Sequence, residues 1–141
     1  MSSTRTEAPV RRWARSNATQ QRILDAATEV FGAAGFTAAT MGDIVTASGD
    51  SIGSIYHHFG GKKELFLAIF ERMAADTDHR IAACAAGIAT DDRQRAFEAN
   101  VRAYLRATWA NRRAVLILAS GDVPAGFDRI RRKRMLTNFR R

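Results

Sequence analysis

The sequence predicts an all-α protein. Apolar residues recur at three- and four-residue steps along most of the chain, which is the spacing of a helix that buries one face. Glycines and capping residues divide this pattern into helix-sized segments. No segment alternates apolar and polar residues with period two, as a half-buried strand would.

The composition fits one globular domain, or a small domain with part of another. The chain has 141 residues, of which 46% are hydrophobic. At this length roughly two-thirds of the unfolded surface can be buried, which is enough for a core without disulfides. Cys84 is the only cysteine, so the sequence excludes a disulfide framework and a paired-cysteine zinc or redox site.

Nothing in the sequence indicates a membrane or a secreted protein. The longest unbroken apolar run, residues 114–119, is far shorter than the ~20 residues that span a bilayer. The Arg-rich start of the chain has no apolar stretch behind it, as a secretory signal would. We therefore expect a cytoplasmic protein without a membrane partner.

The positive charge is concentrated at the two ends. The net charge is +8; residues 1–22 hold five Arg and one Glu, and residues 129–141 hold seven Lys and Arg and no acid. Basic ends around a mildly acidic middle indicate contact with a polyanion, most plausibly nucleic acid. A solvated basic surface is the alternative, and for the basic run 129–134 it is the favoured one.

The first half of the chain is expected to contain a flexible basic arm and three helices. Residues 1–16 are polar and Arg-rich and show no periodicity, so we expect an arm there. A helical pattern runs from Asn17 to the stop at Gly35. Thr40 and Asp43 form a capping-box start for a short helix that ends at Gly49. Ser51 can cap another short helix, which ends before Gly60.

The second half is expected to be helical as well. A long helix starts at Lys62, and its apolar stripe continues to about Ile88. Asp92 marks the start of the next helix, in which Phe97, Tyr104 and Trp109 carry an apolar stripe. A short buried helix over 114–119 and a basic helix over 127–141 follow.

The two short helices joined by a glycine-containing turn predict a helix-turn-helix, whose second helix can lie in the major groove of DNA. Small and hydrogen-bonding residues are expected on its outer face, with Ile55 and Phe59 facing inward. Lys62 adds a positive side chain to the N-terminus of the following helix, which suits a phosphate. Together these features predict a DNA-binding domain over residues 17–66.

The same stretch resembles the DNA-binding domain of the TetR family of bacterial repressors. The resemblance covers residues 17–70, about half of the chain, and a dozen residue types match in order at the family's spacing. The matching segments are Arg22-Ile23-Leu24-Asp25-Ala26-Ala27, Phe31, Gly35-Phe36, Thr40, Asp43-Ile44, Gly49, Gly53-Ser54-Ile55-Tyr56-His57-His58-Phe59, Lys62 and Glu64-Leu65.

This resemblance implies roles for single residues and for the whole chain. Thr40, Ser54, Tyr56 and Lys62 are at positions where family members touch the phosphate backbone, and Ser51, Ile52, Gly53 and His57 are at positions where base edges are read. It also implies a homodimer on a palindromic double-stranded DNA operator, a helical regulatory domain over residues 67–141, and repression that a small-molecule effector relieves. No cofactor is expected.

The sequence departs from the family in two places. Asp50 is at a position that is usually apolar, where its carboxylate must find water or cap the following helix and brings negative charge close to phosphates. The family's C-terminal domain usually continues into two further long helices that form the dimer interface, and this sequence ends before them. We therefore expect an incomplete regulatory domain, and a dimer only where those helices exist.

Other chemistry is weakly indicated. Ser54 and His57 have no third residue that would complete a catalytic triad, and His57 and His58 have no further metal ligands near them, so we expect neither an enzyme nor a metal site. Phe97, Tyr104 and Trp109 are either core residues or the lining of a ligand cavity. Two alternatives to a sequence-specific regulator remain: a truncated helical ligand-binding or interaction protein with weak or no DNA binding, and a sequence-independent nucleic-acid binder.

Overall fold

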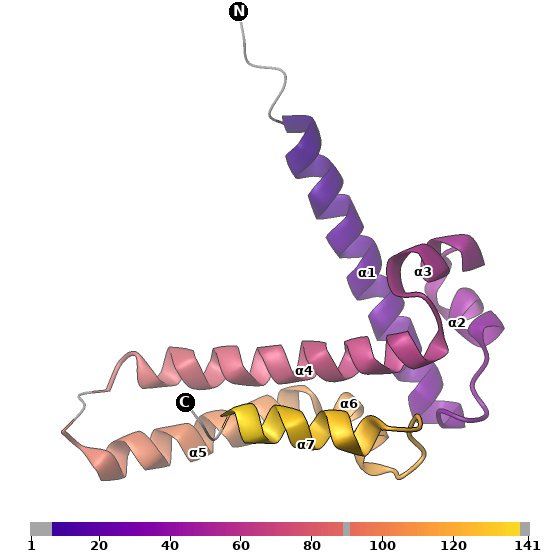
Figure 1. Ribbon diagram of the computed structural model, residues 1–141. Coiled ribbons are helices and arrows are strands. Elements are labelled where there is room, and N and C mark those ends of the chain that lie inside the picture. Colours follow the sequence, from indigo (N-terminus) through magenta and orange to yellow (C-terminus); the bar gives the residue numbers. More distant parts are fainter. Residues whose placement is uncertain (1–6, 89–90, 139–141) are drawn as a thin grey trace, which may run out of the picture.

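The computed structural model describes residues 7–88 and 91–138. Within these residues the protein is all-helical, as predicted, with seven helices and no strand (Figure 1). The helices are α1 (Glu7–Ala34), α2 (Met41–Ser48), α3 (Ile52–Phe59), α4 (Lys62–Ala85), α5 (Arg93–Ala110), α6 (Arg112–Ala119) and α7 (Phe127–Asn138).

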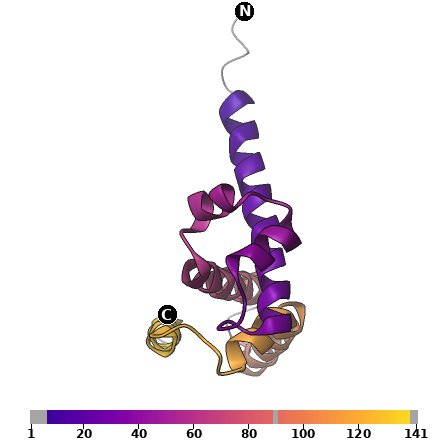
Figure 2. The ribbon, with the colours of Figure 1, turned by 90° about the vertical axis from the view of Figure 1, so that its right-hand side faces the viewer.

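The helices form two connected groups. α2 packs against α1, and α3 contacts α2 and the start of α4, so the three short segments gather at one end of the molecule, as Figure 2 shows from the side. α4 leaves this group, and α5 returns antiparallel along it (Figure 1). α6 then contacts α1, so the chain after α4 comes back to the N-terminal group.

One continuous core joins the two groups. Phe31 of α1 and Phe66 of α4 are buried, with ring centroids 5.9 Å apart. Phe127, the first residue of α7, is only 1% exposed and lies edge-on to Phe66 at 5.1 Å and to Phe70 at 5.2 Å. Such edge-to-face pairs add to the free energy gained by burial. The last helix is therefore fixed to the same core that supports the first four helices.

The structure corrects the expected arm over residues 1–16. α1 begins at Glu7, so residues 7–16 are helical, and these turns project beyond the rest of the molecule (Figure 1). Extending an existing helix needs only propagation, which Ala and Arg favour. Pro9 is in the first turn, where its missing N–H would have had no helical partner anyway. Residues 1–6 lie outside the described part of the chain.

The C-terminal helix α7 is held to α4 by charge as well as by Phe127. Arg134 donates to Asp78 at 2.8 Å and to Glu71 at 3.5 Å, and both acids are on α4. Part of the basic run 129–134 is thus paired with protein carboxylates. Residues 139–141, the end of the basic helix predicted over 127–141, lie outside the described residues.

Candidate nucleic-acid interface

The helix α2 has the cap that the sequence predicted. The Thr40 hydroxyl accepts from the Asp43 N–H at 3.1 Å, and the Asp43 carboxylate accepts from the Thr40 N–H at 3.0 Å. This reciprocal capping box satisfies two N–H groups that the helix leaves open. Gly49 ends α2 at φ +74°, a left-handed conformation that glycine adopts without a steric penalty. The two short helices are thus separated by a tight turn.

The helix α3 is held by one buried side chain and one cap. Ile55 is fully buried between α3 and the core, as predicted. The Ser51 hydroxyl accepts from the Ser54 N–H at 3.1 Å, which caps the helix start. With Ile55 inward, the opposite face of this eight-residue helix must point outward.

That outer face presents most of the residues predicted to read DNA. Ser51, Gly53 and His57 are exposed, and the large side chains of Ile52 and Tyr56 are 51% and 47% exposed. Ser54 is half-buried, and Thr40 is exposed at the start of α2.

Gly53 is the residue of this face that the fold itself does not require. It is inside α3 and does not have a positive φ. A Cβ atom built at Gly53 would meet no atom within 4 Å. Glycine inside a helix costs about 1 kcal/mol compared with alanine. Because neither backbone conformation nor packing calls for glycine here, its presence points to an external partner that approaches closely.

Asp50 has a protein partner, contrary to the expectation that it needs water or caps α3. Its carboxylate accepts from Nε and a terminal nitrogen of Arg22 on α1 at 2.9 and 2.7 Å. These hydrogen bonds hold the pKa of the Asp50 carboxyl below its usual value and raise the pKa of Arg22. A bidentate pair fixes both position and orientation. The pair therefore ties the α2–α3 turn to α1 and offsets the charge of the unusual carboxylate.

Lys62, which is predicted to bind a phosphate, is hydrogen-bonded within the protein. Its Nζ donates to the carbonyls of Phe36, Thr37 and Ala39 at 2.8, 3.2 and 3.1 Å, and it lies over the Phe36 ring. An ammonium has three N–H donors. All three are thus engaged by the loop between α1 and α2. The Lys62 side chain thus fixes the loop that leads into the helix-turn-helix.

The same loop is bound from the C-terminal half of the chain. Asp122, between α6 and α7, accepts from the Thr37 hydroxyl at 2.6 Å and from the Thr37 N–H at 3.2 Å. These bonds lower the pKa of the Asp122 carboxyl. A Cβ at Gly35 would come within 2.5 Å of the same carboxylate, so the contact needs glycine there.

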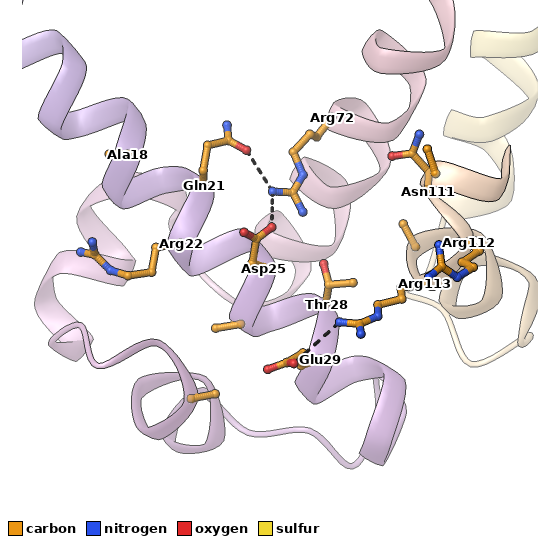
Figure 3. Close-up of a pocket in the computed structure, with 14 residues that line it drawn as sticks. Ala18, Gln21, Arg22, Asp25, Thr28, Glu29, Arg72, Asn111, Arg112 and Arg113 are labelled. Atoms are coloured by element: carbon orange, nitrogen blue, oxygen red, sulfur yellow. Dashed lines mark hydrogen bonds and ion pairs between the residues drawn. The ribbon is translucent and has the colours of Figure 1, made fainter. Parts of the chain in front are cut away.

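A polar cleft lies at the junction of α1, α4 and α6 and has a volume of about 780 Å³ (Figure 3). Arg72 of α4 reaches across it to Gln21 and Asp25 of α1 at 2.9 and 2.8 Å. Arg113 of α6 approaches Glu29 at 3.8 Å. The cleft is thus bridged by ion pairs that link α1 to the helices behind it.

The predicted ligand residues do not line one cavity. Phe97 and Trp109 are 70% and 71% exposed, and only Tyr104 borders the cavity of about 610 Å³ between α4, α5, α6 and α7. The reason is the packing of α5, which places Ala103 and Ala107 against α4. The small residues lie inside and the large apolar ones outside, the reverse of the predicted arrangement. Phe97 and Trp109 are thus exposed and do not border this cavity.

Metal and membrane sites receive no support from the structure. Over residues 7–88 and 91–138 there is no group of three His, Cys, Asp or Glu side chains that could hold a metal ion. Within the same ranges no helix is both long and apolar enough to cross a bilayer.

The sequence did not reveal the contacts that position the interface. Arg22 and Asp50 are 28 residues apart, and Thr37 and Asp122 are 85 residues apart, so no helical spacing connects them. The unusual carboxylate at position 50 was a signal that a compensating cation should exist. Nothing in the sequence identified that cation as Arg22.

Comparisons with known proteins agree with this geometry. Residues 23–69 match the family model described as bacterial regulatory proteins of the tetR family. Over 56 residues the chain is 45% identical to the HTH-type transcriptional regulator SrpR of Pseudomonas putida and 43% identical to the HTH-type transcriptional repressor AcnR of Corynebacterium efficiens. These matches cover 40% of this chain, but only 26% and 30% of the two relatives.

Solved structures extend the similarity beyond the N-terminal helices. A putative tetR family transcription regulator from Shewanella sp. PV-4 superposes with a TM-score of 0.64 at 26% identity, over 73% of this chain and 55% of that one. The regulator PfmR from Thermus thermophilus has the same fold, with a TM-score of 0.65 at 24% identity over 84% of this chain and 62% of the other. By these matches, residues 23–69 form an N-terminal domain similar to that of the TetR family of bacterial transcriptional regulators.

Proposed function

We propose that the chain binds an operator in double-stranded DNA, with α3 in the major groove. The single observation that carries this proposal is the open outer face of α3, where Gly53 leaves space that no part of the protein fills. Ser51, Ile52 and His57 share this face and would meet base edges, because an α-helix fits the groove with a few side chains reaching the bases.

The phosphate contacts are proposed for the residues around this face. Thr40 and Ser54 carry hydroxyl groups close to the two helix starts, Tyr56 carries one on the exposed side of α3, and all three can donate to phosphate oxygens. Lys62 is assigned a different part, because its three donors hold the loop before α2. We propose that Lys62 positions the helix-turn-helix formed by α2 and α3 and does not itself bind a phosphate.

The regulatory part of the proposal concerns the cavity between α4, α5, α6 and α7. Its volume of about 610 Å³ is in the range of small-molecule sites. Apolar residues such as Phe70, Ile81 and Leu118 form much of its lining, with Arg131 and Arg134 beside them. We propose an apolar or amphipathic effector there, whose binding releases a repressor from a palindromic operator in the cytoplasm. The repressor named among the relatives supports this direction of regulation.

Selection from a pool of random duplexes, followed by fluorescence anisotropy at fixed salt, tests the DNA part. We expect one enriched sequence, bound at least 10³-fold more tightly than unrelated DNA. Equal binding to all duplexes, with a steep salt dependence, would instead identify a sequence-independent binder. No binding to either would favour a helical interaction protein without an operator.

A further inference from the structure

The polar cleft between α1, α4 and α6 has the dimensions of a small-molecule site. Its volume of about 780 Å³ lies within the range of roughly 300–1,000 Å³ that such sites occupy. Among the described residues Asn111 alone lines both this cleft and the apolar cavity proposed for the effector, so the two are separate. Five alanines, at positions 18, 26, 47, 110 and 114, form part of the lining and leave the space between the polar side chains open.

Positive side chains outnumber negative ones in the lining of this cleft. The negative ones are the carboxylates of Asp25 and Glu29 on α1. The positive ones are arginines from three helices, namely Arg22 of α1, Arg72 of α4, and Arg112 and Arg113 of α6 (Figure 3). Cations that share one cavity raise the local concentration of anions. The charge of the cleft therefore favours a negatively charged ligand.

The ion pair between Arg113 and Glu29 is the loose contact of the cleft. Its nitrogen and oxygen atoms are 3.8 Å apart, and the two side chains are 73% and 66% exposed. An exposed pair of this kind contributes little to stability. Arg72, by contrast, is 2.8 Å from Asp25 and only 30% exposed. Arg113 can thus turn from Glu29 to a ligand, while Arg72 stays in place as part of the wall.

The start of α6 has a charge arrangement that the fold alone does not favour. Arg112 and Arg113 are in the first turn of this helix, where the positive end of the helix dipole favours acidic residues. Asn111 makes no side-chain cap there, and its amide nitrogen donates to Asp76 at 2.7 Å. Arg112 donates to the Trp109 carbonyl at 3.0 Å, a group without a full negative charge. A negative group in the cleft would offset both arginines and the dipole.

We propose that the cleft binds a small organic anion with at least two carboxylate or phosphate groups. One group would bind Arg112 and Arg113, because guanidinium groups match the oxygens of both carboxylates and phosphates. A second group would reach Arg72 on α4. Since Asp25 and Glu29 interrupt the positive charge, separate negative groups fit the cleft better than a continuous row of phosphates. The site is derived from the cleft alone and holds whether or not the chain binds DNA.

Isothermal titration calorimetry of the full chain tests the site. The probes are inorganic pyrophosphate and benzenetricarboxylate, at about 150 mM salt so that attraction to the net charge is screened. We expect at least one probe to bind one site per chain with a dissociation constant below about 1 mM, and to raise the melting temperature as its concentration rises. The tighter probe identifies the ligand as a phosphate or a carboxylate. Dissociation constants above about 1 mM for both probes overturn the proposal.

Two substitutions in the cleft should change probe binding in opposite directions. Arg113→Gln removes a contact to the ligand and should weaken binding more than tenfold, whereas Glu29→Gln removes the competitor for Arg113 and should tighten binding severalfold. The controls, Arg132→Gln on α7 and Glu98→Gln on α5, remove the same charges outside the cleft and should change the affinity less than about twofold. Circular dichroism confirms that all four variants fold. If Arg113→Gln and Arg132→Gln weakened binding equally, the probe would bind through the net charge and the proposal would be wrong.

Nuclear magnetic resonance locates the probe and distinguishes a small anion from DNA. In an isotope-labelled chain the probe should shift the amide signals of residues 111–114, which line the cleft, and leave those of α3 unchanged. Shifts confined to α3 would place the probe in the DNA interface and would overturn the proposal. A short duplex that displaces the probe, and that Arg113→Gln weakens by the same factor, would identify a DNA phosphate as the occupant and would overturn it as well.

Discussion

A substitution at Gly53 is expected to affect the stability of the fold and the binding of DNA in opposite directions. Because a Cβ at this position has open space, Gly53→Ala should leave the structure unchanged and stabilise α3 by up to about 1 kcal/mol. In the major groove the added methyl group would hold the helix away from the bases. We therefore expect a higher melting temperature together with at least tenfold weaker operator binding, measured by anisotropy.

The control for this change is Gly32→Ala. Gly32 is also exposed and helical, but it is on α1, and its Cβ would come no closer than 4.0 Å to Ile117. This variant should keep full operator affinity. If Gly53→Ala bound the operator as tightly as the unchanged chain, close approach of DNA at α3 would be excluded.

A substitution at Lys62 distinguishes between two roles of this residue, namely positioning the loop before α2 and binding a phosphate. Lys62→Met keeps the length of the side chain but leaves three carbonyls of the α1–α2 loop without their donor. Losing a partner of this kind costs about 1–3 kcal/mol. We expect a clear fall in melting temperature, and weaker DNA binding without a change in the slope of log affinity against log salt. Lys63→Met removes an exposed charge next to it and should leave stability almost unchanged. A slope reduced by about one by Lys62→Met, at full stability, would restore the phosphate role.

The Arg22–Asp50 pair makes part of the stability depend on pH. The pKa of Asp50 is lowered in the folded chain, so the unfolded chain binds its proton more readily. The stabilisation is therefore complete above the unfolded pKa of about 4 and is lost as the pH falls through the lower folded value. Arg22→Ala and Asp50→Asn should each lower the melting temperature at pH 7, and the two effects should not add. Additive effects at pH 7 would show that the pair does not couple the turn to α1.

The N-terminal part of α1 is rich in arginine, and its contribution to DNA binding can be tested. Its backbone projects beyond α3 at the same end of the molecule (Figure 1), and residues 1–15 contain four arginines. Arginines close to DNA release counterions on binding. Deleting residues 1–15 should weaken binding to all duplexes and lower the salt slope. Unchanged affinity at moderate salt would exclude contacts from this segment.

Helix ends were more predictable from the sequence than helix orientation. The capping box at Thr40, the left-handed Gly49 and the cap at Ser51 depend on neighbours within four residues, so the sequence predicted all three. The predicted start of α1 was wrong, because residues 1–16 were interpreted as an arm although residues 7–16 contain nothing that ends a helix. The helix α5 was predicted with its cap at Asp92, but the side on which its large apolar residues lie was not. Periodicity identifies an apolar stripe, but it does not indicate whether that stripe faces the core or the solvent.

In the candidate site, too, local features could be predicted from the sequence and long-range contacts could not. The outer face of α3 could be predicted because a buried Ile55 determines which residues point away. The supports of that face could not, since Lys62, Arg22 and Asp122 act across long sequence separations. Lys62 is instructive: its position suited a phosphate, and only the three-dimensional structure shows that its donors are already occupied.

Asp122 connects the C-terminal helices of the molecule to the loop before α2. It lies between α6 and α7, close to the cavity helices, and its carboxylate holds Thr37 in the loop that leads into α2. The same loop is held by Lys62, which contributes to the lowered pKa of Asp122. A change in the position of α6 or α7 would therefore act on the start of the helix-turn-helix through a direct contact.

Asp122→Asn tests this connection through pH. The lowered pKa means that the carboxylate stabilises the fold above its unfolded pKa and loses this effect as the pH falls through the folded value. We expect the melting temperature of Asp122→Asn to lie below that of the unchanged chain at pH 7, and the two to approach each other as the pH falls below the usual pKa of an aspartate. Asp128→Asn, an exposed acid on α7, should have a smaller effect at pH 7. If hydrogen exchange at the amides of residues 37–41 were the same with and without the Asp122 carboxylate at pH 7, the contact would not support the reading helices from the C-terminal side.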